Sequence, residues 1–412
     1  MKTALFCCLL AGFAALRAQP GSQSLDECLQ SHAAAIRTDD FGQFADLQPL
    51  KSLLKGKRVV LLGESSHGIG GYYTLKSRLV QYLHEELGFE VLAMESGLAD
   101  VYFQYRRIDS LSPRQLRDRT VFGNFQCEEI LPLFEHLHAA RTRARPLHFT
   151  GFDSQNYGSS LEFLQQILER YEPAQAGAIV AGLTAYYRIP AVLWAPDRAP
   201  LFALSDTIMQ AADAAMRAFT AHHADIQAQY QLSATDMQVI RRAIRNYRDA
   251  VDLDWHTQDV TERRDSLMAD NLFWLMDSLY PGKKVIIWGH NGHIGKTSPE
   301  GNPFTWMGER VQARYGAESC HIGLFARAGE TYTWWTRSTD AFERSGPEDL
   351  EQLVQLPGAE AVLLDLGRPC ARMQEPVQAF EVENGGVLRF IPSRRFDAVI
   401  CLRQARAPVY RK

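Results

Sequence analysis

The sequence predicts an α/β fold with a mainly parallel sheet and a helical insertion. Two observations predict it: short apolar strand patterns alternate with helical patterns, and one long central segment carries helical patterns alone. Strands separated by helices are typical of parallel sheets. The expected organisation is an α/β core in two parts, residues 40–160 and 258–412, with the insertion at residues 161–257 between them.

The amino-terminal segment predicts export of the protein. Residues 1–18 read MKTALFCCLLAGFAALRA, in which Lys2 precedes an apolar run and Ala18 is a small residue at the expected cleavage point. This pattern is typical of a secretory signal peptide. We therefore expect a secreted or periplasmic mature protein, without a membrane-spanning segment because no later run of 18 apolar residues follows.

The expected strands and helices follow from local patterns. The run RVVLL at residues 58–62, for example, is apolar and β-branched and ends at Gly63, as a buried strand does. The expected strands cover residues 58–62, 89–94, 147–152, 284–288, 321–325, 361–366 and 396–402. Apolar residues at helical spacing predict helices at residues 74–87, 130–141 and 261–279, and in the insertion at Met237, Ile240, Ile244, Tyr247 and Val251.

Composition and cysteine usage exclude some classes of protein. Hydrophobic residues make up 46% of the 412 residues, which is too many for a disordered chain. The net charge is −4 and no basic cluster is interleaved with aromatic residues, so nucleic-acid binding is not expected. The sequence does not indicate an oligomeric state. After loss of the leader, the cysteines that remain are Cys28, Cys127, Cys320, Cys370 and Cys401. These five permit up to two disulfides, or they could be buried thiols.

Ionisable residues follow four of the expected strands at their carboxyl ends. In open α/β sheets, ligands bind beyond these ends. We therefore expect one shared site. The residues that would form it are Glu64 and His67 after the first strand, Glu95 after the second, Asp153 after the third, and His290, Asn291 and His293 after the fourth.

Imidazoles beside carboxylates suit acid–base chemistry near neutral pH. His67 can take a proton from water while Glu64 or Glu95 orients its ring. His290 or His293 could stabilise an oxyanion or protonate a leaving alkoxide. The pattern thus predicts hydrolysis by activated water.

Other chemistries fit the sequence less well. No G-x-S-x-G nucleophile elbow is present, and Ser65 and Ser66 are expected to hydrogen-bond the turn backbone. The GHNGHIGKT segment ends like a phosphate-binding loop but has five residues between its glycines where that motif has four. A metal shell of His and Glu ligands is an alternative, although no H-E-x-x-H motif supports it, and the expectation is no cofactor.

The helix before the fourth strand adds supporting residues. Arg264, Met268 and Asn271 share one face, so Arg264 and Asn271 could point toward the site. Asp265 and Asp270 are expected on solvated faces. Aromatic residues that could line a cleft for a bulky apolar ligand, although core positions are the safer assignment for each, are Tyr72, Tyr73, Tyr102 and Trp306.

Several of these segments resemble the erythromycin esterase family. LLGESSHGIGGYYTLKSRLVQYLHEELGFEVLAMES is similar to the family's opening block, with its GE-x-S/T-HG signature. The segments GFDSQ, RDSLMADN, WGHNGHIG and RRFDAVICL resemble later blocks, so the likeness runs from about residue 40 to 402.

The resemblance implies a three-layer α/β sandwich with a helical lid, and the opening of macrolide lactones by addition of water without a cofactor. It implies that His67 activates the water and that Glu64, Glu95, His290 and His293 complete the catalytic set. Lys76, Arg264 and Asn271 would be supporting residues by the same likeness, and we add Asp153 and Asn291 from their places at strand ends.

One departure from the family pattern bears on specificity. Where the family often has a charged pair after HG, this chain has Ile69, Gly70 and Gly71. The loss of that carboxylate leaves open which ester is the substrate. Two further hypotheses are a metal-dependent hydrolase of the same fold acting on another ester, and a small-molecule binding protein without catalysis.

Overall fold

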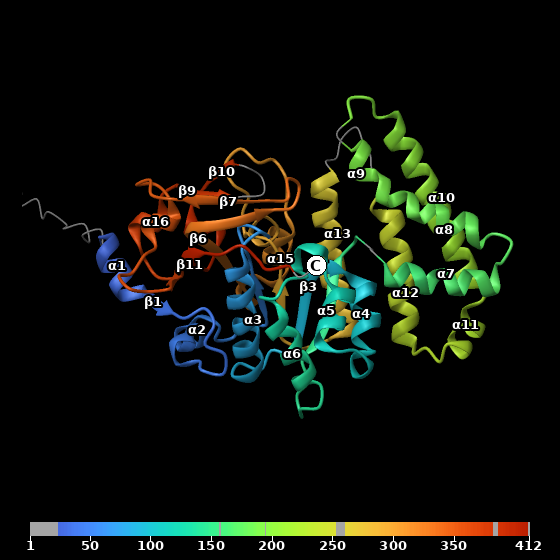
Figure 1. Ribbon diagram of the computed structural model, residues 1–412, viewed down its shortest axis with the longest axis horizontal. Coiled ribbons are helices and arrows are strands. Elements are labelled where there is room, and N and C mark those ends of the chain that lie inside the picture. Colours follow the sequence, from blue (N-terminus) through green and yellow to red (C-terminus); the bar gives the residue numbers. More distant parts are fainter. Residues whose placement is uncertain (1–23, 156–157, 194, 253–259, 382–385, 411–412) are drawn as a thin grey trace, which may run out of the picture.

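The computed structural model describes residues 24–155, 158–193, 195–252, 260–381 and 386–410. The expected signal peptide, residues 1–18, lies outside these ranges. Figure 1 shows an α/β body with a group of helices beside it, at the right of the view. Within the described ranges, no helix combines the length and apolar character that a membrane crossing requires.

A single large sheet organises the body. Its strand order is β1-β8-β11-β6-β2-β5-β3-β4, and β7 pairs with β6. The bounds are β1 Ala33–Ile36, β2 Val59–Leu62, β3 Val91–Gly97, β4 His148–Asp153, β5 Val285–Trp288, β6 Ser319–Thr333, β7 Ser338–Glu343, β8 Ala361–Asp365 and β11 Ala398–Ala405. A separate two-stranded ribbon joins β9 (Val377–Glu381) and β10 (Gly386–Phe390).

The prediction of a mainly parallel sheet is confirmed. β11, β6, β2, β5, β3 and β4 run parallel to one another, whereas β1, β7 and β8 join the sheet through antiparallel pairs. Each of the seven expected strands is present. Leu62 of β2 and Met94 of β3 both pair with Trp288 of β5, so these three strands reach the same level at their carboxyl ends.

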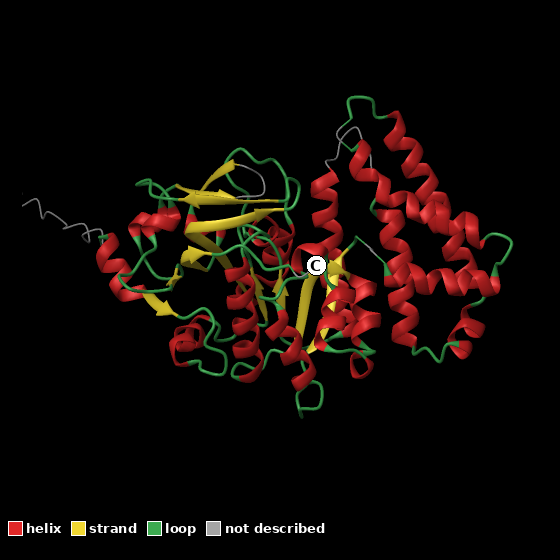
Figure 2. Ribbon diagram, viewed as in Figure 1, coloured by secondary structure: helices red, strands yellow, loops and turns green. Residues whose placement is uncertain are grey.

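Helices cover both faces of the sheet, which makes the body a three-layer sandwich (Figure 2). Alternate residues of β2 point to opposite faces: Val60 and Leu62 join one apolar core, and Val59 and Leu61 join the other. α3 (Gly70–Glu85) and α6 (Leu131–Ala140) pack on the first face with α2 (Gln48–Leu53). α13 (Val260–Trp274) and α15 (Met307–Tyr315) pack on the second with α1 (Leu25–His32) and α16 (Leu350–Leu353).

The body contains further helices and turns between its strands. They are α4 (Leu98–Tyr105), α5 (Pro113–Thr120), α14 (Asn291–Ile294), α17 (Pro392–Arg395) and the π-helical turn η5 (Leu275–Leu279). Short 3₁₀ turns occur at η1 (Ala45–Leu47), η2 (Ile108–Ser110), η3 (Gly123–Phe125), η4 (Ala185–Arg188), η6 (Gly316–Glu318) and η7 (Ala371–Gln374).

The central segment forms a helical unit with its own apolar core. It contains α7 (Ser159–Tyr171), α8 (Ala176–Thr184), α9 (Ile189–Val192), α10 (Ala199–Ala221), α11 (His223–Gln229) and α12 (Ala234–Asp249). Met237, Ile240, Ile244 and Tyr247 of α12 are all buried in this core, as their spacing predicts. Contacts of α12 and α7 with α4 join the unit to the body.

One disulfide links distant parts of the chain. Cys28 in α1 bonds to Cys370 beside η7, with 5.6 Å between their Cα atoms. Cys127, Cys320 and Cys401 are buried thiols without a disulfide. Of the two alternatives left open by the sequence, a disulfide applies to Cys28 and Cys370, and buried thiols apply to these three cysteines.

Candidate active site

The expected convergence of side chains at one edge of the sheet is confirmed by the geometry. The ring centroids of His67 and His290 are 5.1 Å apart, and those of His290 and His293 are 6.3 Å apart. Glu95 of β3 lies among them and accepts a hydrogen bond of 3.0 Å from the backbone amide of His290. The level carboxyl ends of β2, β3 and β5 bring these residues together.

Glu64 orients the ring of His67 through a contact with its Nδ1 atom. The Oε1 atom of Glu64 is 3.2 Å from Nδ1 of His67, and its other oxygen pairs with Lys76. Because a carboxylate can only accept, Nδ1 of the neutral ring carries the proton and Nε2 carries the lone pair. This tautomer suits a general base. His67 is the more accessible partner, with 18% of its side chain exposed, whereas Glu64 is buried.

Lys76 is buried under this dyad and does not line the cavity. It also donates to the carbonyl of Gly289 at 3.2 Å and lies 4.3 Å from the ring centre of Trp288. Burial lowers the pKa of Lys76 below its usual value, whereas the negative charges of Glu95 and of its ion-pair partner Glu64 favour the ammonium form. Lys76 is therefore a supporting residue, because it neutralises the charge of Glu64 without contacting the cavity.

Replacing Lys76 by methionine is expected to lower the free energy of unfolding by about 3–5 kcal/mol, because Glu64 would lose its buried cation. Urea denaturation measures this. The control is Lys283→Met, whose partly exposed pair with Glu90 (2.7 Å) should contribute less than about 1 kcal/mol. Equal losses for the two variants would contradict a buried ion pair under the site.

Arg264 holds two carboxylates at the same edge. Its guanidinium pairs with Asp153, the last residue of β4, and donates to Oε1 of Glu95 at 3.0 Å. Although burial lowers the pKa of Arg264, the two acids raise it well above its usual value. Burial alone would raise the pKa of Glu95, but His293, His67 and Arg264 lower it well below the usual range, so Glu95 stays ionised.

Asp265 is the functional residue that the sequence prediction misplaced. It was expected on a solvated face, but it is fully buried, and its carboxylate lies 2.8 and 3.0 Å from Nδ1 of His293. The backbone amide of Met307 donates to it at 2.9 Å. The signal was present, since Asp265 shares a helix face with the buried residues Met268 and Ala269. Asp270 is exposed, as expected.

His293 has two neighbours that require opposite hydrogen-bond roles at Nε2. Arg264 can donate to this nitrogen at 3.3 Å when the ring is neutral, and the protonated ring can donate toward Oε1 of Glu95 at 3.5 Å. Burial disfavours the charged ring, but Asp265 and Glu95 outweigh it and raise the pKa of His293. The ring is therefore poised to hold and release a proton.

His290 is held in the neutral form. Burial, with the adjacent imidazoles of His67 and His293, lowers its pKa well below the usual value. Its Nδ1 accepts the amide of Gly292 at 3.1 Å. The proton of the neutral ring is therefore on Nε2, and this nitrogen is itself buried.

The remaining expected site residues support the backbone. Asn271 donates to the carbonyl of Phe152 at 2.9 Å and accepts from Arg242 at 2.7 Å, which ties α13 to the end of β4. Asn291 uses both ends of its amide on the backbone of Leu324. The hydroxyl of Ser66 accepts the amide of Gly68 at 2.9 Å, as expected of a turn serine.

A cavity of about 500 Å³ lies at the carboxyl edge of the sheet. His67, Glu95, Arg264, His290 and His293 are in its wall, together with the aromatic residues Phe122, Trp306, Trp334 and Trp335. Sequence reasoning named only Trp306 of these four. Tyr72 and Tyr73, the alternative candidates, are core residues, and Tyr102 lines a different hollow.

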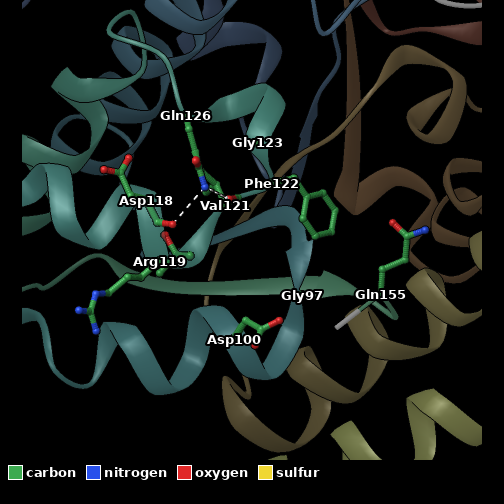
Figure 3. A pocket seen from close by; sticks show the side chains of 10 residues that line it. Gly97, Asp100, Asp118, Arg119, Val121, Phe122, Gly123, Gln126 and Gln155 are labelled. Atoms are coloured by element: carbon green, nitrogen blue, oxygen red, sulfur yellow. Dashed lines mark hydrogen bonds between the residues drawn. The ribbon is translucent and has the colours of Figure 1, made fainter. Parts of the chain in front are cut away.

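A second hollow of about 480 Å³ adjoins this cavity and shares three of its wall residues, Phe122, Gly123 and Gln155. Figure 3 shows the segment that carries Val121, Phe122 and Gly123 above Gly97 and Asp100 at the start of α4. Phe122 and Gln155 thus stand between the catalytic cavity and this more polar extension. Together the two hollows provide room for a large ligand.

Among the residues that the structure describes, no group of three or more His, Cys, Asp or Glu side chains is arranged to hold a metal ion. The carboxylates of the site are instead engaged by Lys76, Arg264 and imidazole groups. Fold and site together define an α/β protein with imidazoles and carboxylates gathered in the wall of one cavity, an arrangement typical of enzymes that use acid–base chemistry.

Comparisons with known proteins identify the family. The sequence model of the erythromycin esterase family matches residues 84–405, which is most of the chain, and the chain belongs to this family. Membership makes it a hydrolase of the esterase type with a small-molecule substrate. The matched range begins after Glu64, His67 and Lys76, so the assignment of these residues depends on the motif and the geometry.

Individual relatives agree with this membership. The chain is 25% identical over 386 residues to Putative hydrolase YbfO of Bacillus subtilis strain 168, covering 88% of this chain and 86% of that protein. It is 23% identical over 315 residues to erythromycin esterase type II of Escherichia coli, covering 70% and 73%. A solved mutant of the erythromycin esterase EreC in its open conformation shares the fold, with a TM-score of 0.61 at 17% identity over 91% of this chain and 98% of that one.

Proposed function

We propose that this protein is an exported ester hydrolase that opens a macrolide-type lactone ring by adding water. The observation that carries the proposal is the meeting of His67, Glu95, His290 and His293 in the wall of one cavity. Export is supported by the amino-terminal leader and by the disulfide between Cys28 and Cys370, a bond typical of oxidising compartments.

In the proposed reaction, His67 acts as the general base. Nε2 takes a proton from water while Glu64 stabilises the charge that forms on the ring. The water oxygen bonds to the ester carbonyl carbon, and the neutral ring of His290, in the wall of the cavity, stabilises the resulting oxyanion. When the carbon–oxygen bond of the ester breaks, the imidazolium of His293 protonates the leaving alkoxide. One water is consumed and one acid and one alcohol form. The proton gained by His67 passes to solvent and His293 takes one up, which restores both rings.

The direct test uses the mature protein with erythromycin-type lactones and a panel of simple esters. The expected product is heavier than the substrate by one water, detected by mass spectrometry. Turnover of simple esters without lactones would retain the esterase and reject the macrolide substrate. Thermal stabilisation by a lactone without turnover of any ester would favour the binding-protein alternative.

The proposed mechanism needs no metal, since cationic side chains and imidazoles already neutralise the carboxylates of the site. We therefore expect ester hydrolysis to be unchanged after treatment with a chelator and removal of that chelator. Activity that disappears and returns with one added divalent metal would contradict this and favour the metal-dependent hydrolase. Elemental analysis of the treated protein is the control that the metal was removed.

A further inference from the structure

A short segment after the last strand crosses the active-site edge of the sheet. Residues 406–410, here called the strap, follow β11 and in Figure 1 run from the sheet toward the centre of the view. No strap residue lines the catalytic cavity. The strap nevertheless contacts three segments that form its walls.

The first contact fixes the turn after His67. The amide of Gly70 donates to the carbonyl of Arg406 at 2.8 Å. A Cβ atom added to Gly70 would lie 3.1 Å from Cα of Pro408 and 2.9 Å from Cγ of Glu129. Glycine at position 70 therefore lets the strap pass close to α3, which gives the departure from the family pattern a physical reason.

The second contact fixes the wall between the two hollows. Val409 accepts the amide of Glu128 at 3.0 Å, and its own amide donates to both carboxylate oxygens of Glu129 at 3.0 and 3.1 Å. The hydroxyl of Tyr410 donates to the carbonyl of Asn124 at 2.9 Å. Asn124 lines the catalytic cavity directly after Phe122 and Gly123.

The third contact fixes the tryptophan wall. Nε1 of Trp334 donates to the hydroxyl of Tyr410 at 3.2 Å, and the two ring centroids are 4.9 Å apart. Tyr332 packs on both rings, at 5.3 Å from Tyr410 and 5.5 Å from Trp334. The amide of Tyr332 also donates to the carbonyl of Gly68, beside His67, at 2.9 Å. Trp335, 83% exposed, continues this wall at the cavity rim.

We propose that the strap positions the aromatic walls of the catalytic cavity and that Tyr410 is its central positioning residue. One hydroxyl connects Asn124 on one wall to Trp334 on another, and each hydrogen bond joins segments that are distant in sequence. The strap thereby sets the shape into which a bulky substrate fits, while His67, His290 and His293 are held by other contacts. The catalytic part of this inference rests on the proposed ester hydrolysis.

The test compares Tyr410→Phe and Tyr410→Ala with the wild-type protein. Tyr410→Phe removes both hydrogen bonds and keeps the ring, so KM for a bulky lactone or ester should rise about 2- to 10-fold. Tyr410→Ala should raise it further. For a small acetate ester, kcat should stay within about twofold, because the catalytic groups are not held by Tyr410.

A second measurement does not depend on esterase activity. Hydrogen exchange of amides at residues 122–126 and 332–335 should become faster in both Tyr410 variants, and tryptophan emission should shift. The matched control is Tyr230→Phe, which removes a hydroxyl on the helical unit 3.4 Å from the carbonyl of Gln166. Unchanged exchange in Tyr410→Ala would overturn the positioning role. Faster exchange without any ester turnover by wild-type protein would retain the strap and reject the proposed hydrolysis.

Discussion

Replacing His67 by alanine is expected to lower kcat for ester hydrolysis about 10²–10⁴-fold, the range typical of a lost general base. KM should change little, because the aromatic walls that would contact a bulky substrate remain. The fold should persist, since Lys76 still pairs with the buried carboxylate of Glu64. A time course of product formation measures kcat, and thermal unfolding shows whether the variant is still folded.

His148→Ala is the matched control for this variant. His148 lies at the amino end of β4, with its ring centroid 5.3 Å from that of Tyr280, and does not line the catalytic cavity. Its removal should leave kcat within about twofold. If His67→Ala retained activity within about tenfold of wild type, another group would have to act as the base.

The second large effect is expected from Asp265→Asn, which keeps the size of the side chain and removes its charge. The amide oxygen can still accept from Met307, so the amide nitrogen would face Nδ1 of His293 and disfavour its protonation. We expect kcat to fall on the order of 10²-fold or more, because His293 would lose its acidic proton and its correct tautomer.

The pH profile separates this role from a structural one. In wild type, Asp265 and Glu95 outweigh burial and raise the pKa of His293, so its acid form persists above the usual titration range and activity falls only as pH rises through the raised pKa. Asp265→Asn lowers that pKa, so the alkaline fall of kcat/KM should move to lower pH. Asp270→Asn, on the exposed face of the same helix, is the control. An unmoved alkaline limb in Asp265→Asn would reject His293 as the acid.

The local order of the sequence was sufficient to predict the central sheet and the edge at which the site lies. Short apolar runs such as residues 58–62 and 284–288 become buried parallel strands, and the polar residues after them must emerge at a common edge. The antiparallel pairs of β1 with β8 and of β6 with β7 were not expected. β1 is AAAI, whose alanines have low strand propensity, and β7 is STDAFE, which lacks the apolar character of a buried strand.

The partners of the site residues were harder to predict. His67, Glu95, His290 and His293 could be placed together because each follows a strand, which is a local signal. Asp265 was misjudged because the residues of a helix can face either the core or solvent, and the packing of α13 beside α15 decided the matter.

Local sequence is enough to show which groups stand at the carboxyl ends of the parallel strands, because a strand and its end are defined by neighbouring residues. The partners of these groups are set by the packing of the folded chain. Lys76 pairs with Glu64, Asp265 contacts His293, and Tyr410 hydrogen-bonds both Asn124 and Trp334. Such contacts join residues separated by up to 286 positions, and no local periodicity encodes them. They arise when packing removes these polar groups from water and each must find a partner.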